Sequence, residues 1–172
     1  MAATDALLRG NPWQAATVDN AQQLLVGGTW TNASQFSILA EAWWDGAALS
    51  DAQWRDWGLR NQRLAALLGK GPPGSAIAGN LAWQADAFSA ASNLRRGNLF
   101  LRLSWQNGAW QPAVDLLYTP ADGGRLLTAS LLWQGDRVSM QGGVRAAAGP
   151  AGAVLRQLPN QLQQYVNVTW AF

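Results

Sequence analysis

Apolar residues recur at every second position along most of the chain, which is the spacing of β-strands with one apolar face. In the clearest segment, residues 98–108, one face is entirely apolar and consists of Leu99, Leu101, Leu103 and Trp105. The same alternation is strong in residues 36–46, 109–120, 125–136 and 137–146, and weaker in residues 22–31, 80–90 and 163–172. The pattern predicts about eight strands of roughly ten residues each.

Short turn sequences separate several of these segments. Asn107-Gly108, Gly135-Asp136 and the stretch from Pro120 to Gly124 have the composition of hairpin connections. Consecutive strands joined by hairpins run antiparallel. We therefore expect an all-β fold with an antiparallel, up-and-down order of strands.

One segment, near residues 50–68, has the spacing of a helix instead. Ser50 or Asp51 is suited to the N-cap, and the Gly- and Pro-rich residues 69–74 end the segment. Its apolar positions fall on one helical stripe, made of Trp54, Trp57, Leu64, Leu67 and Leu68. Such a stripe is typical of packing against the rest of the protein, and binding to a membrane surface is the alternative. We expect a β-domain over residues 21–172 with a helical insert at 49–79, preceded by an N-terminal segment, 1–20, in which a remnant of an earlier strand is one interpretation.

The composition excludes several kinds of chemistry. The 172 residues include no His and no Cys, so a Ser-His-Asp triad, a Cys nucleophile and the ordinary zinc sites cannot be built. We expect no enzymatic activity, no catalytic residues, no metal and no cofactor. Arg95-Arg96 is the only adjacent basic pair, and the net charge is +2, so nucleic acid is not an expected partner.

The polar faces of the predicted strands indicate the solvent. Charged residues make up 13% of the chain, with a single Lys and a single Glu, whereas soluble surfaces favour both residues. The opposite face carries isolated charges of both signs, which suit a barrel interior where charges pair: Glu41, Asp86, Arg102, Asp115 and Arg145. We expect these five residues to form an interior charge network in a narrow barrel, or to line the lumen of a wider one.

The eleven Trp residues are the second sign of a membrane. Aromatic side chains collect at membrane–water interfaces because the ring is apolar while its N–H or O–H group remains hydrated. Counting eight strands back from the C-terminus places most of the aromatic residues at one rim of the barrel: Trp44, Trp83, Trp105, Trp110, Trp133 and Trp170. The same count places Trp30 and Tyr118 at the other rim.

The C-terminal octapeptide YVNVTWAF, together with the alternating segments, resembles the outer-membrane β-barrel proteins of Gram-negative bacteria. The residues that match the C-terminal strand of that class are Val166, Val168, Trp170 and Phe172. The resemblance implies a closed transmembrane barrel in the bacterial outer membrane, in contact with lipid, whose last strand is the signal read by the barrel-assembly machinery. It covers residues 21–172 except the helical insert and indicates no narrower family.

The chain departs from this class in two ways. The strand count places the helical insert at the rim of the short turns, so either one strand is miscounted or the helix is a plug or an interface element. No segment has the form of a signal peptide, which predicts either a mature form or the C-terminal part of a longer barrel.

These features predict a non-enzymatic integral membrane barrel, either structural or a pore for small solutes. One alternative is the C-terminal part of a larger, porin-like barrel that needs further strands from another chain or from a homo-oligomer. The other alternative is a soluble, Trp-rich β-sheet binding module.

Overall fold

The computed structural model describes residues 22–48, 50–71, 74–81, 95–158 and 160–171. The chain divides into two compact units. One contains residues 23–45 and 97–172 and holds the strands of the described residues, and the other contains residues 1–22 and 46–96 and holds the helical segment. Each unit is described by itself.

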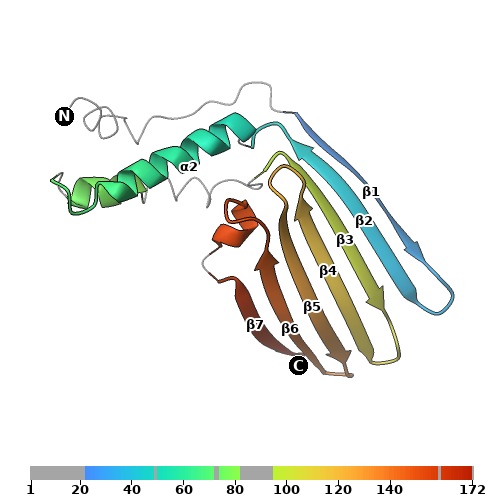
Figure 1. Cartoon of the computed structure of the whole chain (residues 1–172). Coiled ribbons are helices and arrows are strands. Elements are labelled where there is room, and N and C mark those ends of the chain that lie inside the picture. Colours follow the sequence, from blue (N-terminus) through green and yellow to red (C-terminus); the bar gives the residue numbers. More distant parts are fainter. Residues whose placement is uncertain (1–21, 49, 72–73, 82–94, 159, 172) are drawn as a thin grey trace. The chain divides into compact units, whose positions relative to one another are not determined.

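The first unit is a single antiparallel sheet in which the strands follow one another in chain order (Figure 1). Its seven strands are β1 (Gln23–Thr31), β2 (Phe36–Asp45), β3 (Gly97–Trp105), β4 (Trp110–Thr119), β5 (Gly124–Gln134), β6 (Val138–Ala148) and β7 (Leu162–Trp170). The prediction of an up-and-down antiparallel sheet is confirmed, and seven of the predicted strand segments are strands.

The turns follow from local sequence. Gly108 has a φ of 57°, which glycine adopts without steric cost, and it lies in the tight turn between β3 and β4. In the turn between β1 and β2, the side chain of Asn32 accepts a hydrogen bond from the backbone N–H of Phe36 at 2.9 Å. Asn and Gly at these positions explain why the chain reverses there.

The eighth predicted strand, at residues 80–90, is wrong for its described part. Residues 74–81 are helical, and the Asn80 side chain donates to the carbonyl of Ala76, one helical turn earlier, at 3.0 Å. Residues 82–94 lie outside the described part of the chain. Since β2 pairs directly with β3, from Phe36↔Trp105 to Trp44↔Gly97, the sheet has no place for a strand between them.

The sheet is not closed within the described residues. There, β1 is bonded only to β2, and β7 only to β6. The structure therefore shows an open seven-stranded antiparallel sheet. Closure of this sheet into a barrel stays a prediction.

Removing the eighth strand also changes the expected side of the helical insert. Three short connections, 32–35, 106–109 and 135–137, lie at the end of the sheet where β7 finishes, here called the turn rim. The opposite end, here called the loop rim, carries the two long connections, 46–96 and 149–161, and the short turn 120–123. The insert thus leaves and re-enters the sheet at the loop rim, and the strand count was one too high.

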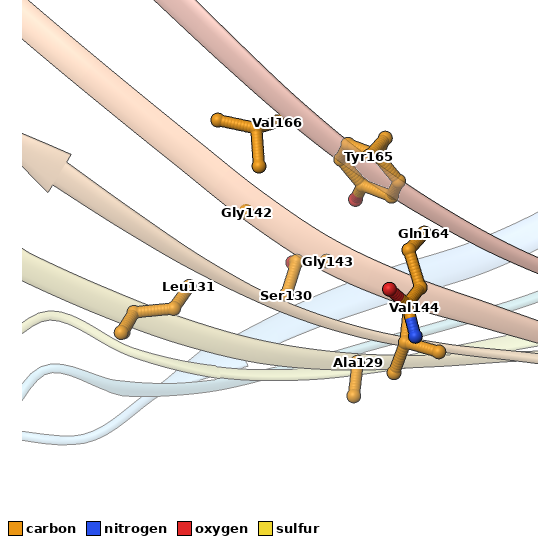
Figure 2. Close-up of a pocket in the computed structure, with 9 residues that line it drawn as sticks. All are labelled: Ala129, Ser130, Leu131, Gly142, Gly143, Val144, Gln164, Tyr165 and Val166. Carbon is orange, nitrogen blue, oxygen red and sulfur yellow. The ribbon is translucent and has the colours of Figure 1, made fainter.

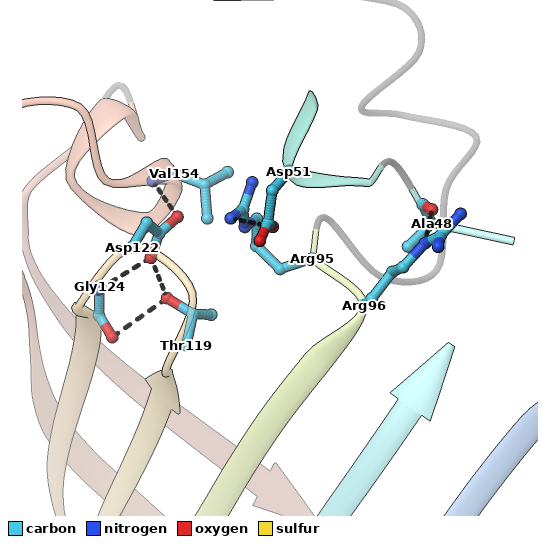
Figure 3. Close-up of polar contacts among 8 residues, drawn as sticks. All are labelled: Ala48, Asp51, Arg95, Arg96, Thr119, Asp122, Gly124 and Val154. Atoms are coloured by element: carbon cyan, nitrogen blue, oxygen red, sulfur yellow. Dashed lines mark hydrogen bonds and ion pairs between the residues drawn. The ribbon is translucent and has the colours of Figure 1, made fainter. Parts of the chain in front are cut away.

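The second unit contains the helix α2 (Asp51–Ala66), close to the predicted 50–68. The small core of this unit includes Leu64 and Ile77, which are both fully buried. The rings of Trp54 and Trp57 stack on each other, with their centroids 4.9 Å apart. Arg95 forms an ion pair with Asp51 at 2.8 Å (Figure 3). In the described residues, no helix has the length and hydropathy needed to cross a membrane.

Candidate functional site: the two faces of the sheet

One face of the sheet is apolar across all seven strands. Directly paired residues share a face, and the pairing Ile38↔Leu103↔Val114↔Ala129↔Val144 runs through five consecutive strands. The parallel rows on either side are similar and contain, for example, Leu101↔Leu116↔Leu127. The polar exceptions on the strands of this apolar face are Arg125, at the start of β5, and Gln164 on β7.

The apolar face is also the exposed face. Val114 and Leu127 are 43% and 48% exposed, while Ala113 and Thr128, their sequence neighbours on the other face, are 5% and 7% exposed. A soluble sheet protein has the reverse arrangement, because its apolar face packs in the core. Here the less exposed side of the sheet is the opposite face, here called the polar face, which carries charged and polar residues beside apolar ones such as Leu117 and Leu126.

Aromatic residues lie at both ends of the apolar face. The turn rim carries Trp30, Trp105, Trp110, Trp133 and Trp170, and the loop rim carries Trp44 and Tyr118. Trp110 and Trp133 are cross-strand partners whose ring centroids lie 6.5 Å apart. The indole N–H of Trp105 donates to the carbonyl of Ser34 at 2.9 Å, so its polar group is satisfied at the rim.

Trp30 and Trp44 lie at the rims opposite to those expected from the sequence. Trp30 lies at the turn rim and Trp44 at the loop rim, because the strand wrongly counted at 80–90 inverted every rim before it. Trp83 lies outside the described residues. The expectation that these aromatic residues contact a membrane interface stays a prediction.

The polar face carries one row of charged and hydroxyl side chains. The row runs Arg102↔Asp115↔Thr128↔Arg145 through β3 to β6. Arg102 Nε lies 3.6 Å from Asp115 Oδ1, an ion-pair distance that is too long for a hydrogen bond. Arg145 Nε donates to Thr128 Oγ1 at 3.3 Å.

The expected five-membered charge network is therefore only partly assembled. Arg102, Asp115 and Arg145 share one row, while Glu41 lies one row nearer the loop rim, paired with Gly27 and Phe100. Within the described residues, Glu41 and Arg145 form no ion pair. Asp86 lies outside the described residues.

A pair of glycines opens a hollow in the sheet at β6. The hollow, of about 500 Å³, is lined by Ala129, Ser130, Leu131, Gly142, Gly143, Val144, Gln164, Tyr165 and Val166 (Figure 2). On the polar face, the Tyr165 ring covers its partner Gly143, where an added Cβ would lie 2.5 Å from the ring. Gly142 faces the other side and leaves the apolar surface indented between Leu131 and Val166. The Gly-Gly pair in the sequence was the only sign of this feature.

A loop is fastened to the loop rim through Asp122. The Asp122 carboxylate accepts hydrogen bonds from the Thr119 hydroxyl, from Gly124 N at 2.9 Å and from Val154 N at 3.1 Å (Figure 3). Val154 begins the short helix η1 (Val154–Gln157), and Val154 and Leu155 are buried. The sequence analysis did not predict this role for Asp122, because it treated residues 120–124 only as a hairpin connection.

The C-terminal strand places its matching residues on the exposed apolar face. Val166, Val168 and Trp170 pair with Gly142, Met140 and Val138, and they are 73%, 61% and 64% exposed. Phe172 lies outside the described residues. The role of these residues in assembly stays a prediction.

The described residues were also searched for clusters of side chains that could bind a metal ion. Across the described residues, no group of three or more Asp, Glu, His or Cys side chains is placed to hold a metal ion.

Comparison of the chain with protein-family models, with curated proteins and with solved structures finds no significant match in any of the three.

Proposed function

We propose that the sheet is part of the wall of an integral β-barrel in a bacterial outer membrane, and that the barrel acts without catalysis as a structural barrel or a pore for small solutes. The observation that carries the proposal is the exposure of a continuous apolar face over seven strands. In water, such a face would be an aggregation site far larger than the patches soluble monomers expose. Against lipid chains it is the stable surface.

The dimensions of the sheet support a bilayer as the solvent. β4 has 10 residues, which extend over about 33 Å and rise about 25 Å when the strand is tilted by about 40°. This height matches the apolar band of outer-membrane barrels. The aromatic residues at both ends of the band lie where their rings would meet the two interfaces.

The polar face would then line the interior of the barrel. Its central row contains Arg102, Asp115 and Arg145, and Glu41 lies in the adjacent row, so both signs of charge are represented. A water-filled interior of this composition would have weak selectivity between small anions and cations. The resemblance of the C-terminal strand to outer-membrane proteins supports the proposal that the barrel-assembly machinery inserts it.

The proposal is tested by refolding the chain into detergent micelles and into phospholipid vesicles. We expect a strand-type circular dichroism spectrum, partition with the vesicles and, once the barrel is closed, discrete conductance steps in a planar bilayer. A folded, monodisperse protein in plain buffer that ignores vesicles would contradict the proposal and favour the soluble Trp-rich binding module.

A further inference from the structure

The polar face of the sheet changes character along the strands. On the turn-rim side of the charged row, the next row is small or polar, as in the pairing Ser104↔Ala113↔Ser130. On the loop-rim side, the next row is apolar on four consecutive strands, β3 to β6. We call these four residues the inner apolar band: Phe100, Leu117, Leu126 and Ala147.

The short helix η1 bounds the inner apolar band at the loop rim. The Cβ of Leu155 lies 3.4 Å from a Cβ added at Gly124, which precedes Leu126 by two residues and shares its face. The Asp122 carboxylate holds the helix there by accepting hydrogen bonds from Val154 N and Gly124 N (Figure 3). The band itself stays partly exposed, since each of its four residues is only half-buried.

The charged row places a cation directly beside the band. Arg145 precedes Ala147 by two residues on β6, so the two side chains share the polar face. The residues opposite Arg145 are Thr128 and Gln163, which carry no charge. Asp115, the carboxylate of the same row, lies against Arg102. Within the described residues, Arg145 therefore has no carboxylate partner.

One hydrogen bond determines which atoms of Arg145 are available. Its Nε donates to Thr128 Oγ1 at 3.3 Å, which leaves the two terminal amino groups of the guanidinium for another acceptor. A guanidinium binds a carboxylate through two parallel hydrogen bonds. An apolar wall with one charged group at its end is also the usual composition of a small-molecule site.

We infer that the polar face binds an amphiphilic carboxylate, with its carboxylate on Arg145 and its apolar chain along the inner apolar band. The inference rests on the proposed function, because this face becomes a shielded interior only in a barrel. The band crosses four strands, a span of about 14 Å at the usual strand spacing. This span suits an acyl chain of medium length, such as that of decanoate. A small inorganic anion would leave the band uncovered, and an uncharged chain would leave Arg145 unpaired.

The absence of cysteine allows a direct test on the full chain. Leu117→Cys reports on the middle of the band, and Ser104→Cys, on the same face toward the turn rim, is the matched control. Each variant is folded in micelles of an uncharged detergent and labelled with a neutral, water-soluble maleimide. We expect saturating decanoate to slow labelling at position 117 by at least about tenfold and to leave labelling at position 104 unchanged. Equal labelling rates at position 117 with and without decanoate would overturn the inference.

Three related probes separate the two parts of the ligand. 1-Decanol keeps the chain without the charge, decyltrimethylammonium reverses the charge, and acetate keeps the carboxylate without the chain. Each should protect position 117 far less than decanoate does. Protection by any of them equal to that by decanoate would overturn the inference, because one part of the ligand would then suffice or the detergent itself would be responsible.

Variants of the cation identify the residue that binds the carboxylate. In the Leu117→Cys chain, Arg145→Gln should abolish protection by decanoate and Arg145→Lys should retain part of it. Arg125→Gln, on the apolar face, is the matched control and should keep full protection. Full protection in Arg145→Gln would overturn the assignment. If Arg145→Gln does not fold, the comparison of the probes on Leu117→Cys alone decides the question.

These outcomes are separate from those of the proposed function. A chain that stays in buffer and does not partition into vesicles refutes the membrane proposal. A chain that partitions into vesicles but is labelled equally with and without decanoate refutes only the carboxylate site.

Discussion

Arg102 and Asp115 are direct cross-strand partners on the polar face, with Arg102 Nε 3.6 Å from Asp115 Oδ1. Asp115 Oδ1 is a buried atom without a hydrogen bond, so Arg102 is the charge that compensates it. Beyond Asp115, the row continues through Thr128 to Arg145, whose Nε donates to Thr128 Oγ1 at 3.3 Å.

The first prediction concerns this pair. Arg102→Glu places two carboxylates opposite each other and should lower the free energy of unfolding by about 1–2 kcal/mol, a modest figure because the Arg102 side chain is 41% exposed. Thermal denaturation in micelles measures the effect. Arg125→Glu, at the loop rim, is the matched control and should be close to neutral. Equal melting temperatures for Arg102→Glu and the parent chain would show that the ion pair does not contribute.

The second prediction concerns the glycine under Tyr165. Gly143→Val should destabilise the protein by about 1–3 kcal/mol, because the new side chain overlaps the Tyr165 ring. Gly142→Ala is the control, since the nearest atom to its added Cβ is 4.0 Å away. Chemical denaturation followed by circular dichroism compares the two variants. Truncation of the ring in Gly143→Val/Tyr165→Ala should recover part of the loss, and no recovery would assign the loss to another cause.

The third prediction concerns the loop fastened by Asp122. Asp122→Ala removes the acceptor for Thr119, Gly124 and Val154 and should release residues 149–158 from the rim. The cost is about 1–3 kcal/mol, confined to the loop. Limited trypsin digestion should then cleave faster after Arg156. Asp122→Asn keeps one acceptor oxygen and should show an intermediate rate, while parent-like cleavage of Asp122→Ala would contradict the anchoring role.

The fourth prediction concerns the C-terminal strand. Trp170→Ser/Phe172→Ser should slow insertion into vesicles in the presence of the assembly machinery while leaving expression unchanged. Thr169→Ser, on the opposite face of β7, is the matched control. Insertion kinetics followed by protease protection give the readout. Identical kinetics for the double variant and the control would refute the assignment of an assembly signal.

The strands could be predicted from the sequence because alternation is a local property, and β3 to β6 carry it strongly. The strand predicted at residues 80–90 is wrong for its described part, because Asn80 and Leu81 belong to the helical residues 74–81. That single error inverted the rims of Trp30 and Trp44. The partnership of Arg102 with Asp115 depends on register between strands, and Asp122 reaches a backbone 32 residues away, so neither interaction could be read from local spacing.

The measurement that tests the central claim most directly compares two adjacent positions on β4. Ala113 and Val114 point to opposite faces, and the parent chain has no cysteine, so a single spin label can be attached at either position. In phospholipid vesicles, we predict that the label at position 114 is accessible to oxygen and shielded from a water-soluble nickel reagent. The label at position 113 should be shielded from oxygen in comparison. Equal access of the nickel reagent to position 114 would place water against the apolar face and contradict the membrane-barrel account.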